Sequence, residues 1–236
     1  MTNRSNVVDA RQHLIIDADD TLWENNVYFE RAIEEFIDFL DHSALSREDV
    51  RAVLNEIERA NAKTHGYGSA VFTRNLRDCY QRLAQREIAE DDLTIVMRFG
   101  ERILSHPMEL IDGVEQTLTL LSTRHSLVLF TKGNPEEQQR KIDLSGIAQY
   151  FTREVIVSEK DVAAYLRLLG ELACDPHSTW MIGNSPKSDI NPALAAGLNA
   201  VFIPHEQTWS LEHDELASGP GQLLVLARFP ELGEHF

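Results

Sequence analysis

Five short apolar segments recur along the chain, each bounded by polar residues or glycine. They are rich in β-branched residues, leucine and phenylalanine, and their apolar character is continuous rather than alternating. Continuous apolarity over so few residues is typical of strands that are buried on both faces, as in a parallel sheet. We therefore predict strands at residues 13–16, 126–130, 154–157, 179–182 and 200–203.

Helical patterns lie between the later apolar segments. Asn134 followed by proline forms an N-cap signature that predicts a helix to about residue 144. Residues 162–173 carry apolar side chains at helical spacing, and a further helix over residues 191–196 ends at Gly197. Strands and helices that alternate in this way predict βαβ crossovers. The fold class is therefore α/β, with a Rossmann-like three-layer core and a mainly parallel sheet.

The segment between the first two predicted strands differs, because it contains no strand pattern. Its apolar side chains repeat at helical spacing, and Ser46 with Asp49 matches a capping box. The tail from Ser218 reads as a loop and an appended terminal segment. We predict an all-helical insert of about four helices, which occupies residues 25–108 within a core formed by residues 1–24 and 109–236.

Acidic side chains outnumber basic ones. The chain of 236 residues has 38 Asp and Glu against 22 Lys and Arg, a formal net charge of −16. Such a surface repels nucleic-acid backbones and anionic lipids, so we expect no nucleic-acid or membrane partner. No apolar stretch approaches the roughly 18 residues of a membrane span. The first eleven residues are polar, and the apolar run after them is too short for a signal peptide.

Only two cysteines occur, Cys79 and Cys174, and each lies in a helix-like pattern. Buried thiols explain them better than a disulfide or a metal pair. Because a reducing compartment is the default for such a chain, we expect a cytoplasmic protein.

Ligands of open parallel sheets bind beyond the carboxyl ends of the strands. Two carboxylates, Asp17 and Asp19, follow the first predicted strand. A hydroxyl follows the second strand and a lysine follows the third, at Thr131 and Lys160, while residues 183–189 add an amide and an acid after the fourth. These groups supply the nucleophile, the acid or base and the positive charge that phosphoryl transfer needs.

Taken in this order, the motifs resemble the haloacid dehalogenase superfamily of aspartate-dependent phosphohydrolases. The resemblance covers residues 10–24 and 112–210. D-A-D-D-T-L-W is similar to the first motif of that family, Thr131 to the second, Lys160 to the third and G-N-S-P-K-S-D to the fourth. The helical insert stands where type-one members carry their cap. The resemblance implies a Mg²⁺-dependent phosphatase with a Rossmann-like core and a helical cap.

The resemblance also implies roles for individual residues. Asp17 would attack phosphorus to form an aspartyl-phosphate, and Asp19 would act first as general acid and then as general base. Thr131, Lys132 and Lys160 would hold the phosphoryl oxygens and stabilise the charge of the transition state.

A magnesium site follows from the same resemblance. The Asp17 carboxylate, the Asp19 backbone carbonyl and side chains of the fourth motif would bind Mg²⁺. Asn184 departs from the family pattern, because many members have aspartate there, and a neutral amide is expected to bind the metal more weakly. Asp189 either ligates the metal directly or acts through the residues that do.

The segment from His65 to Gly68 places an aromatic side chain between two glycines, between two predicted helices of the cap. Caps of this family use such loops to contact the leaving group, so His65 and Tyr67 are candidate substrate contacts, with a plain turn as the alternative. The expected partner is a small phosphorylated metabolite. Aromatic side chains such as Tyr67 and Phe72 favour a flat leaving group, as in a nucleoside monophosphate.

Three other functions stay open. A haloacid dehalogenase uses an aspartate nucleophile, but its halide needs no general acid, so Asp19 favours phosphate chemistry. A phosphomutase of the same superfamily has both acids. A catalytically silent binding protein belongs to a different class, and the presence of Asp17, Asp19, Thr131 and Lys160 argues against it.

Overall fold

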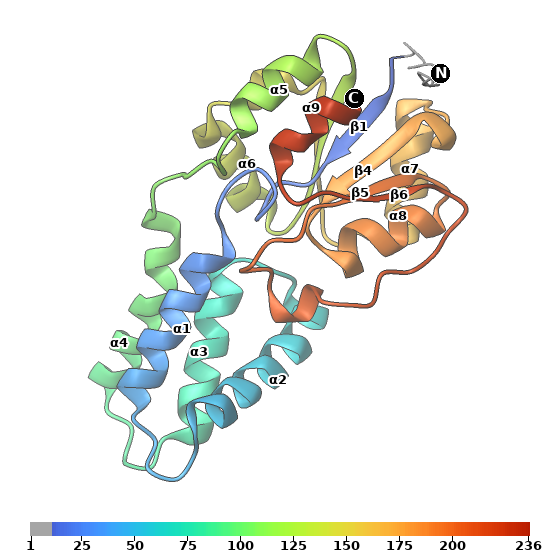
Figure 1. The fold of residues 1–236 in the computed structure, drawn as a ribbon. Helices are drawn as coiled ribbons and strands as arrows, with labels where there is room; N and C mark the ends of the chain where they lie inside the picture. Colours follow the sequence, from blue (N-terminus) through green and yellow to red (C-terminus); the bar gives the residue numbers. More distant parts are fainter. Residues whose placement is uncertain (1–10) are drawn as a thin grey trace.

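The computed structural model describes residues 11–236, and these contain one sheet of six strands (Figure 1). The order across the sheet is β3-β2-β1-β4-β5-β6, and all neighbouring strands are parallel. The predicted α/β class and all five predicted strands are confirmed. The strands are β1 (His13–Ile16), β2 (Ser126–Lys132), β3 (Arg153–Val157), β4 (Thr179–Gly183), β5 (Asn199–Phe202) and β6 (Leu223–Val225).

Strand β6 corrects the prediction for the tail, which assigns no strand after Ser218. It pairs only with β5 and forms one edge of the sheet. Its three residues are half-buried or exposed, so its apolar run is too short and too poorly covered to give a strand signal.

Helices cover both faces of the sheet (Figure 1). Side chains of α5, α6 and α9 pack in one apolar cluster with Leu14 and Ile16 of β1. Side chains of α7 and α8 pack in another cluster with Ile15, which points to the opposite face. Three layers result, as predicted. The bounds are α5 (Val114–Ser122), α6 (Pro135–Ser145), α7 (Val162–Leu172), α8 (Asn191–Ala195) and α9 (Leu232–His235), with short turns η2 (Ala148–Tyr150), η3 (Pro176–Ser178), η4 (Pro186–Ile190), η5 (Ser210–Glu212) and η6 (Phe229–Glu231).

Between β1 and α5 the chain forms a helical insertion that lies apart from the sheet (Figure 1). We call its helices the cap. Ser46 and Asp49 form the predicted capping box at the start of the second helix. The cap has its own apolar cluster, which includes Phe36, Leu54 and Leu76 and no residue of the sheet. The cap helices are α1 (Asn26–Leu40), α2 (Arg47–His65), α3 (Ser69–Leu83) and α4 (Glu90–Glu101), followed by the turn η1 (Arg102–Ser105).

No helix within residues 11–236 is long and apolar enough to cross a membrane. The polar N-terminal segment, on which the signal-peptide argument rests, lies outside these described residues except for Arg11. Both cysteines carry free thiols. Cys79 is buried in α3, whereas Cys174 is half-buried and lies beyond α7 rather than inside a helix, because Ala173 adopts a left-handed conformation that ends α7.

Candidate active site

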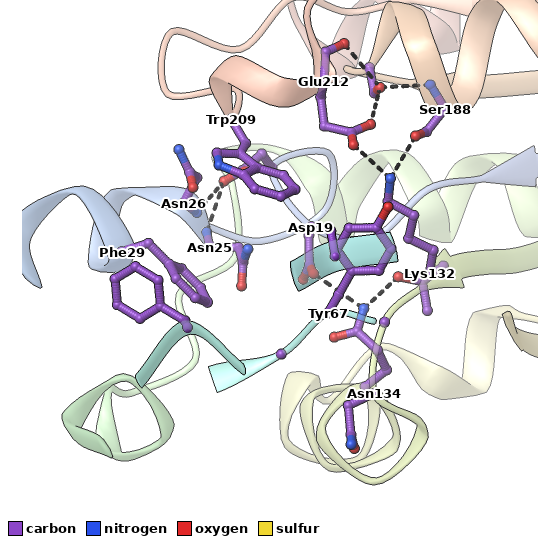
Figure 2. Close-up of a pocket in the computed structure, with 18 of the residues that line it drawn as sticks. Asp19, Asn25, Asn26, Phe29, Tyr67, Lys132, Asn134, Ser188, Trp209 and Glu212 are labelled. Carbon is purple, nitrogen blue, oxygen red and sulfur yellow. Dashed lines mark hydrogen bonds and ion pairs between the residues drawn. The ribbon is translucent and has the colours of Figure 1, made fainter. Parts of the chain in front are cut away.

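A cavity of about 170 Å³ lies between the carboxyl edge of the sheet and the cap. Loops that follow β1, β2, β3 and β4 line the core side, and α1, α2, α3 and the loop between α2 and α3 line the cap side. Figure 2 shows Asp19, Lys132 and Glu212 of the core and Phe29 and Tyr67 of the cap around this space. The lining includes every core residue that the sequence singles out, namely Asp17, Asp19, Thr131, Lys132, Lys160, Asn184 and Asp189.

Lys160 joins two buried carboxylates at the core end of the cavity. Its Nζ pairs with the carboxylate of Asp17 and lies 2.8 Å from Oδ1 of Asp189. Burial, followed by the charge of Asp189, raises the pKa of Asp17 to about 7, although Lys160 acts in the opposite direction. One cation is therefore shared by two carboxylates, which leaves the buried cluster short of positive charge.

Asp189 is held so that both of its carboxylate oxygens have protein partners. Oδ1 contacts Lys160, and Oδ2 accepts a hydrogen bond from the backbone N–H of Ser185 at 2.9 Å. The side chain lies against Gly183, where a Cβ would stand only 2.3 Å from Oδ2. Glycine is needed here because any larger residue would displace the Asp189 carboxylate.

Several oxygen atoms beside Asp17 suit a hard divalent cation. Oδ2 of Asp17 and Oδ1 of Asn184 both accept from the hydroxyl of Thr21, at 3.0 and 3.3 Å. The amide of Asn184 is oriented because its Nδ2 donates to Thr208 Oγ1 at 2.9 Å. Within the described residues, the backbone carbonyl of Asp19 accepts no hydrogen bond. A carboxylate, an amide oxygen and a free carbonyl fit Mg²⁺, which prefers oxygen ligands.

Three side chains hold the carboxylate of Asp19 at the cavity wall. Nζ of Lys141 lies 2.6 and 2.7 Å from its two oxygens, and Trp23 Nε1 donates to Oδ1 at 2.7 Å. Nε2 of Gln138 donates to Oδ2 of Asp19 at 3.2 Å and to Oγ1 of Thr131 at 2.5 Å. Gln138 thus links the expected acid to the expected phosphate-binding hydroxyl.

Lys132 lines the cavity as part of an ion pair (Figure 2). Its Nζ lies 2.6 Å from Glu212 and 2.7 Å from Ser188 Oγ, and it stands 4.6 Å from the ring centre of Tyr67. Burial alone would raise the pKa of Glu212, but Lys132 and the hydroxyls of Ser185 and Ser188 hold it below its usual value. Because Glu212 neutralises Lys132, this lysine has less charge to offer a phosphate than the sequence suggests.

The loop between α2 and α3 lies over the cavity and is fixed to the core. Its Tyr67 hydroxyl donates to Glu159 at 2.7 Å, and its ring lies edge-on to Trp209 with ring centres 6.0 Å apart. The backbone N–H and hydroxyl of Ser69 both donate to Glu137 of α6, at 2.9 and 2.8 Å. Tyr67 is therefore held at the cavity wall, and its contact with a substrate stays a prediction.

His65 does not share this position. Helix α2 continues through His65, so the side chain leaves the last helical turn toward solvent and does not line the cavity. This corrects the expectation that His65 and Tyr67 approach the substrate together.

Sequence reasoning missed four side chains of the site. Gln138 and Lys141 lie about one turn apart on α6, and the available signal was the start of this predicted helix at the carboxyl edge of the sheet. Glu212 and Glu58 carry no comparable signal, because an isolated acid in η5 or in an amphipathic helix is usually a surface residue.

The family model of haloacid dehalogenase-like hydrolases matches residues 12–197, which is most of the chain. The chain belongs to this hydrolase family. The match includes β1 with Asp17, the cap and the loops that carry Thr131, Lys160 and Asp189. The resemblance seen in the sequence is thereby confirmed, including a type-one helical cap inserted after the first strand.

Solved structures share the arrangement of this haloacid dehalogenase-like hydrolase. A haloacid dehalogenase-like family hydrolase from Xanthomonas campestris has a TM-score of 0.82 and 28% identity, over 96% of this chain and 94% of that one. A putative hydrolase of the family from Bacillus subtilis, bound to magnesium, has a TM-score of 0.68 and 15% identity, over 96% and 99%.

A curated relative of the hydrolase is a phosphoserine phosphatase from Thermus thermophilus. It is 29% identical over 83 residues, which are 33% of this chain and 33% of the relative. The chain thus matches about one third of the length of this relative.

Proposed function

We propose that this hydrolase cleaves phosphate monoesters of small molecules and uses Mg²⁺ as its cofactor. The observation that carries the proposal is the presence of two carboxylates, Asp17 and Asp19, at one cavity with Thr131 and Lys160. A dehalogenase needs the nucleophile alone, since halide leaves without a proton. The second acid, held in place by Lys141, therefore favours phosphate esters over haloacids.

In the first proposed step, an oxygen of Asp17 attacks phosphorus and the bond from phosphorus to the ester oxygen breaks. Protonated Asp19 gives its proton to the departing oxygen, and an aspartyl-phosphate remains. In the second step, Asp19 takes a proton from water, the water oxygen attacks phosphorus, and phosphate leaves with regeneration of Asp17. Trp23 and Lys141 orient Asp19 for both transfers.

The phosphate dianion needs positive charge beside Asp17, in a protein of strongly negative net charge. Lys160 supplies part of it, and Thr131 adds a hydroxyl. Mg²⁺, when bound, supplies the remaining positive charge at this end of the cavity. We assign its protein ligands as the Asp17 carboxylate, the Asp19 carbonyl and the Asn184 amide. Asp189 acts on this site by holding Lys160.

Hydrolysis of p-nitrophenyl phosphate with and without Mg²⁺ tests the proposal. We expect metal-dependent turnover that Asp17→Asn abolishes, because an amide does not attack phosphorus. Asp19→Asn should lower the rate on an alkyl phosphate by about 10²–10⁴-fold, the usual contribution of general acid–base catalysis.

Two results would contradict the proposal. Chloride release from 2-chloropropionate, lost in Asp17→Asn, would make the chain a dehalogenase. Undiminished turnover of an alkyl phosphate by Asp19→Asn would remove the acid–base role. A silent binding protein would show no turnover of either substrate.

A further inference from the structure

Glu58 of α2 is a buried carboxylate that the proposed reaction does not use. Its side chain is 5% exposed, and it lines the same cavity as Asp17. The indole N–H of Trp209 donates to its Oε2 at 3.4 Å. Within the described part of the chain, no lysine, arginine or histidine forms an ion pair with it. A buried carboxylate with one long hydrogen bond and no ion pair can accept further donors, and Glu58 lies where a bound ligand could supply them.

Arg51 is the cation of the cap that acts on Glu58, but it is engaged elsewhere. Its guanidinium pairs with both carboxylate oxygens of Glu30, at 2.6 and 2.8 Å, and donates to Asn55. It does not line the cavity. The charge of Arg51 is thus neutralised by Glu30, and Arg51 forms no ion pair with Glu58.

The rest of the cap side of the cavity is uncharged, with apolar and aromatic side chains and the amides of Asn26 and Asn75. Among the described residues of α1, α2 and α3, Glu58 is the one charged residue in the lining. The rings of Phe29 and Phe72 meet edge to face with centres 5.0 Å apart, and Tyr67 meets Trp209 in the same way. Figure 2 shows Phe29, Tyr67 and Trp209 around the cavity.

The lysines of the cavity cannot serve a second anion at this end. Lys132 pairs with Glu212, Lys141 with Asp19, and Lys160 with Asp17 and Asp189, all on the core side. A leaving group that carries a carboxylate would therefore meet Glu58 without a counter-charge. A neutral nucleobase, which the aromatic side chains alone suggest, could donate hydrogen bonds to Glu58 but would bring no positive charge to it.

We propose that the leaving group carries a positive charge, so that the substrate is the phosphate ester of an amino alcohol whose ammonium group binds between Glu58 and the aromatic rings. This inference rests on the proposed phosphatase function. Aromatic faces together with a carboxylate are the surroundings in which organic cations are bound by proteins. Glu58 is then a residue that determines specificity, at the opposite wall from Asp17.

Two esters of equal shape test the proposal directly. Phosphocholine and 3,3-dimethylbutyl phosphate differ in one atom, a charged nitrogen against a neutral carbon. We expect kcat/KM at pH 8 to favour phosphocholine or phosphoethanolamine by about tenfold or more, mainly through KM. Glu58→Gln should remove this preference, so that kcat/KM for the two esters becomes equal. Glu56→Gln, on the same helix but exposed and paired with Arg82, is the matched control and should keep the preference.

Binding separates this inference from the proposed function. In Asp17→Asn, calorimetry should show tighter binding of phosphocholine than of its neutral isostere, and added Glu58→Gln should equalise the two. Equal turnover and equal binding of both esters would overturn the cation site while the phosphatase function stands. If neither ester is hydrolysed, the phosphatase function fails and the binding ratio alone decides on the cation site. If Glu58→Gln does not fold, the test is the ratio of the two binding affinities, phosphocholine to neutral ester, in the Asp17→Asn protein with Glu58 intact.

Discussion

Replacing Glu58 by glutamine should flatten the dependence of folding stability on pH. Burial raises the pKa of Glu58 from 4.5 to about 7, against the lowering effect of Arg51 and Trp209, and Glu30 raises it further. The thiol of Cys79 on α3 also faces this carboxyl group. A carboxyl whose pKa is higher in the folded chain binds its proton more tightly there. Its contribution to stability is therefore full below pH 4.5 and is lost as the pH rises through about 7.

The size of the effect follows from the two pKa values. A rise from 4.5 to about 7 corresponds to about 3 kcal/mol of unfolding free energy, since one pKa unit is worth about 1.4 kcal/mol. Glutamine keeps the shape of the side chain and its acceptor for the Trp209 N–H, but it carries no charge to desolvate. The free energy of unfolding of Glu58→Gln should therefore exceed that of the unmodified protein by up to about 3 kcal/mol at pH 8 and by little below pH 5.

Urea unfolding at pH 5 and pH 8, with Glu56→Gln as the exposed control, measures this difference. With a denaturant slope of about 3 kcal/mol per molar for a chain of this size, the urea midpoint of Glu58→Gln should lie about 1 M higher at pH 8. Glu56→Gln should have the same urea midpoint as the unmodified protein at pH 5 and at pH 8. A Glu58→Gln midpoint that stays level with the control at pH 8 would refute the reasoning, because the carboxylate would then be hydrated or paired.

Two other predictions concern the core side of the cavity. Lys160→Met, unfolded by urea in EDTA at pH 8, should lose about 3–5 kcal/mol of unfolding free energy, because Asp17 and Asp189 would stay buried without a cation. Lys187→Met, at an exposed lysine, is the control. An equal urea midpoint for both variants would contradict the interpretation that the two carboxylates share Lys160. Asn184→Asp should tighten Mg²⁺ binding in calorimetric titrations, because a carboxylate replaces a neutral ligand; unchanged affinity would place Asn184 outside the metal site.

The fold was largely predictable because its signals are local. Continuous apolar runs mark strands that are buried on both faces, and the run at Leu14–Ile16 is fully buried in the sheet. Asn134 before proline marks the start of α6 for the same reason, because the N-cap of a helix depends only on residues that are neighbours in the sequence. Strand β6 has no such signal, because it lies at the sheet edge and covers three residues.

The site was predictable only where sequence order determines position. Asp17, Thr131 and Lys160 each follow a strand, and parallel strands bring their ends to one edge. Contacts between the cap and the core depend on how the two pack, which no local pattern encodes. For that reason the sequence does not predict the hydrogen bond between Trp209 and Glu58. It also does not predict that α2 continues through His65, which therefore does not line the cavity with Tyr67.

The distribution of charge along the cavity links the two proposals. At the core end, Lys160 and a bound Mg²⁺ would offset Asp17 and Asp189, so that a phosphate dianion finds positive charge there. At the cap end, Glu58 lies beside Trp209 and forms no ion pair within the described residues. A substrate with negative charge at its phosphate and positive charge on its alcohol matches both ends at once. Tyr67, in the loop between α2 and α3, and Ser69, the first residue of α3, bind Glu159 and Glu137 of the core. These contacts fix the cap end of the cavity relative to the core end, so the separation of charge can select a substrate.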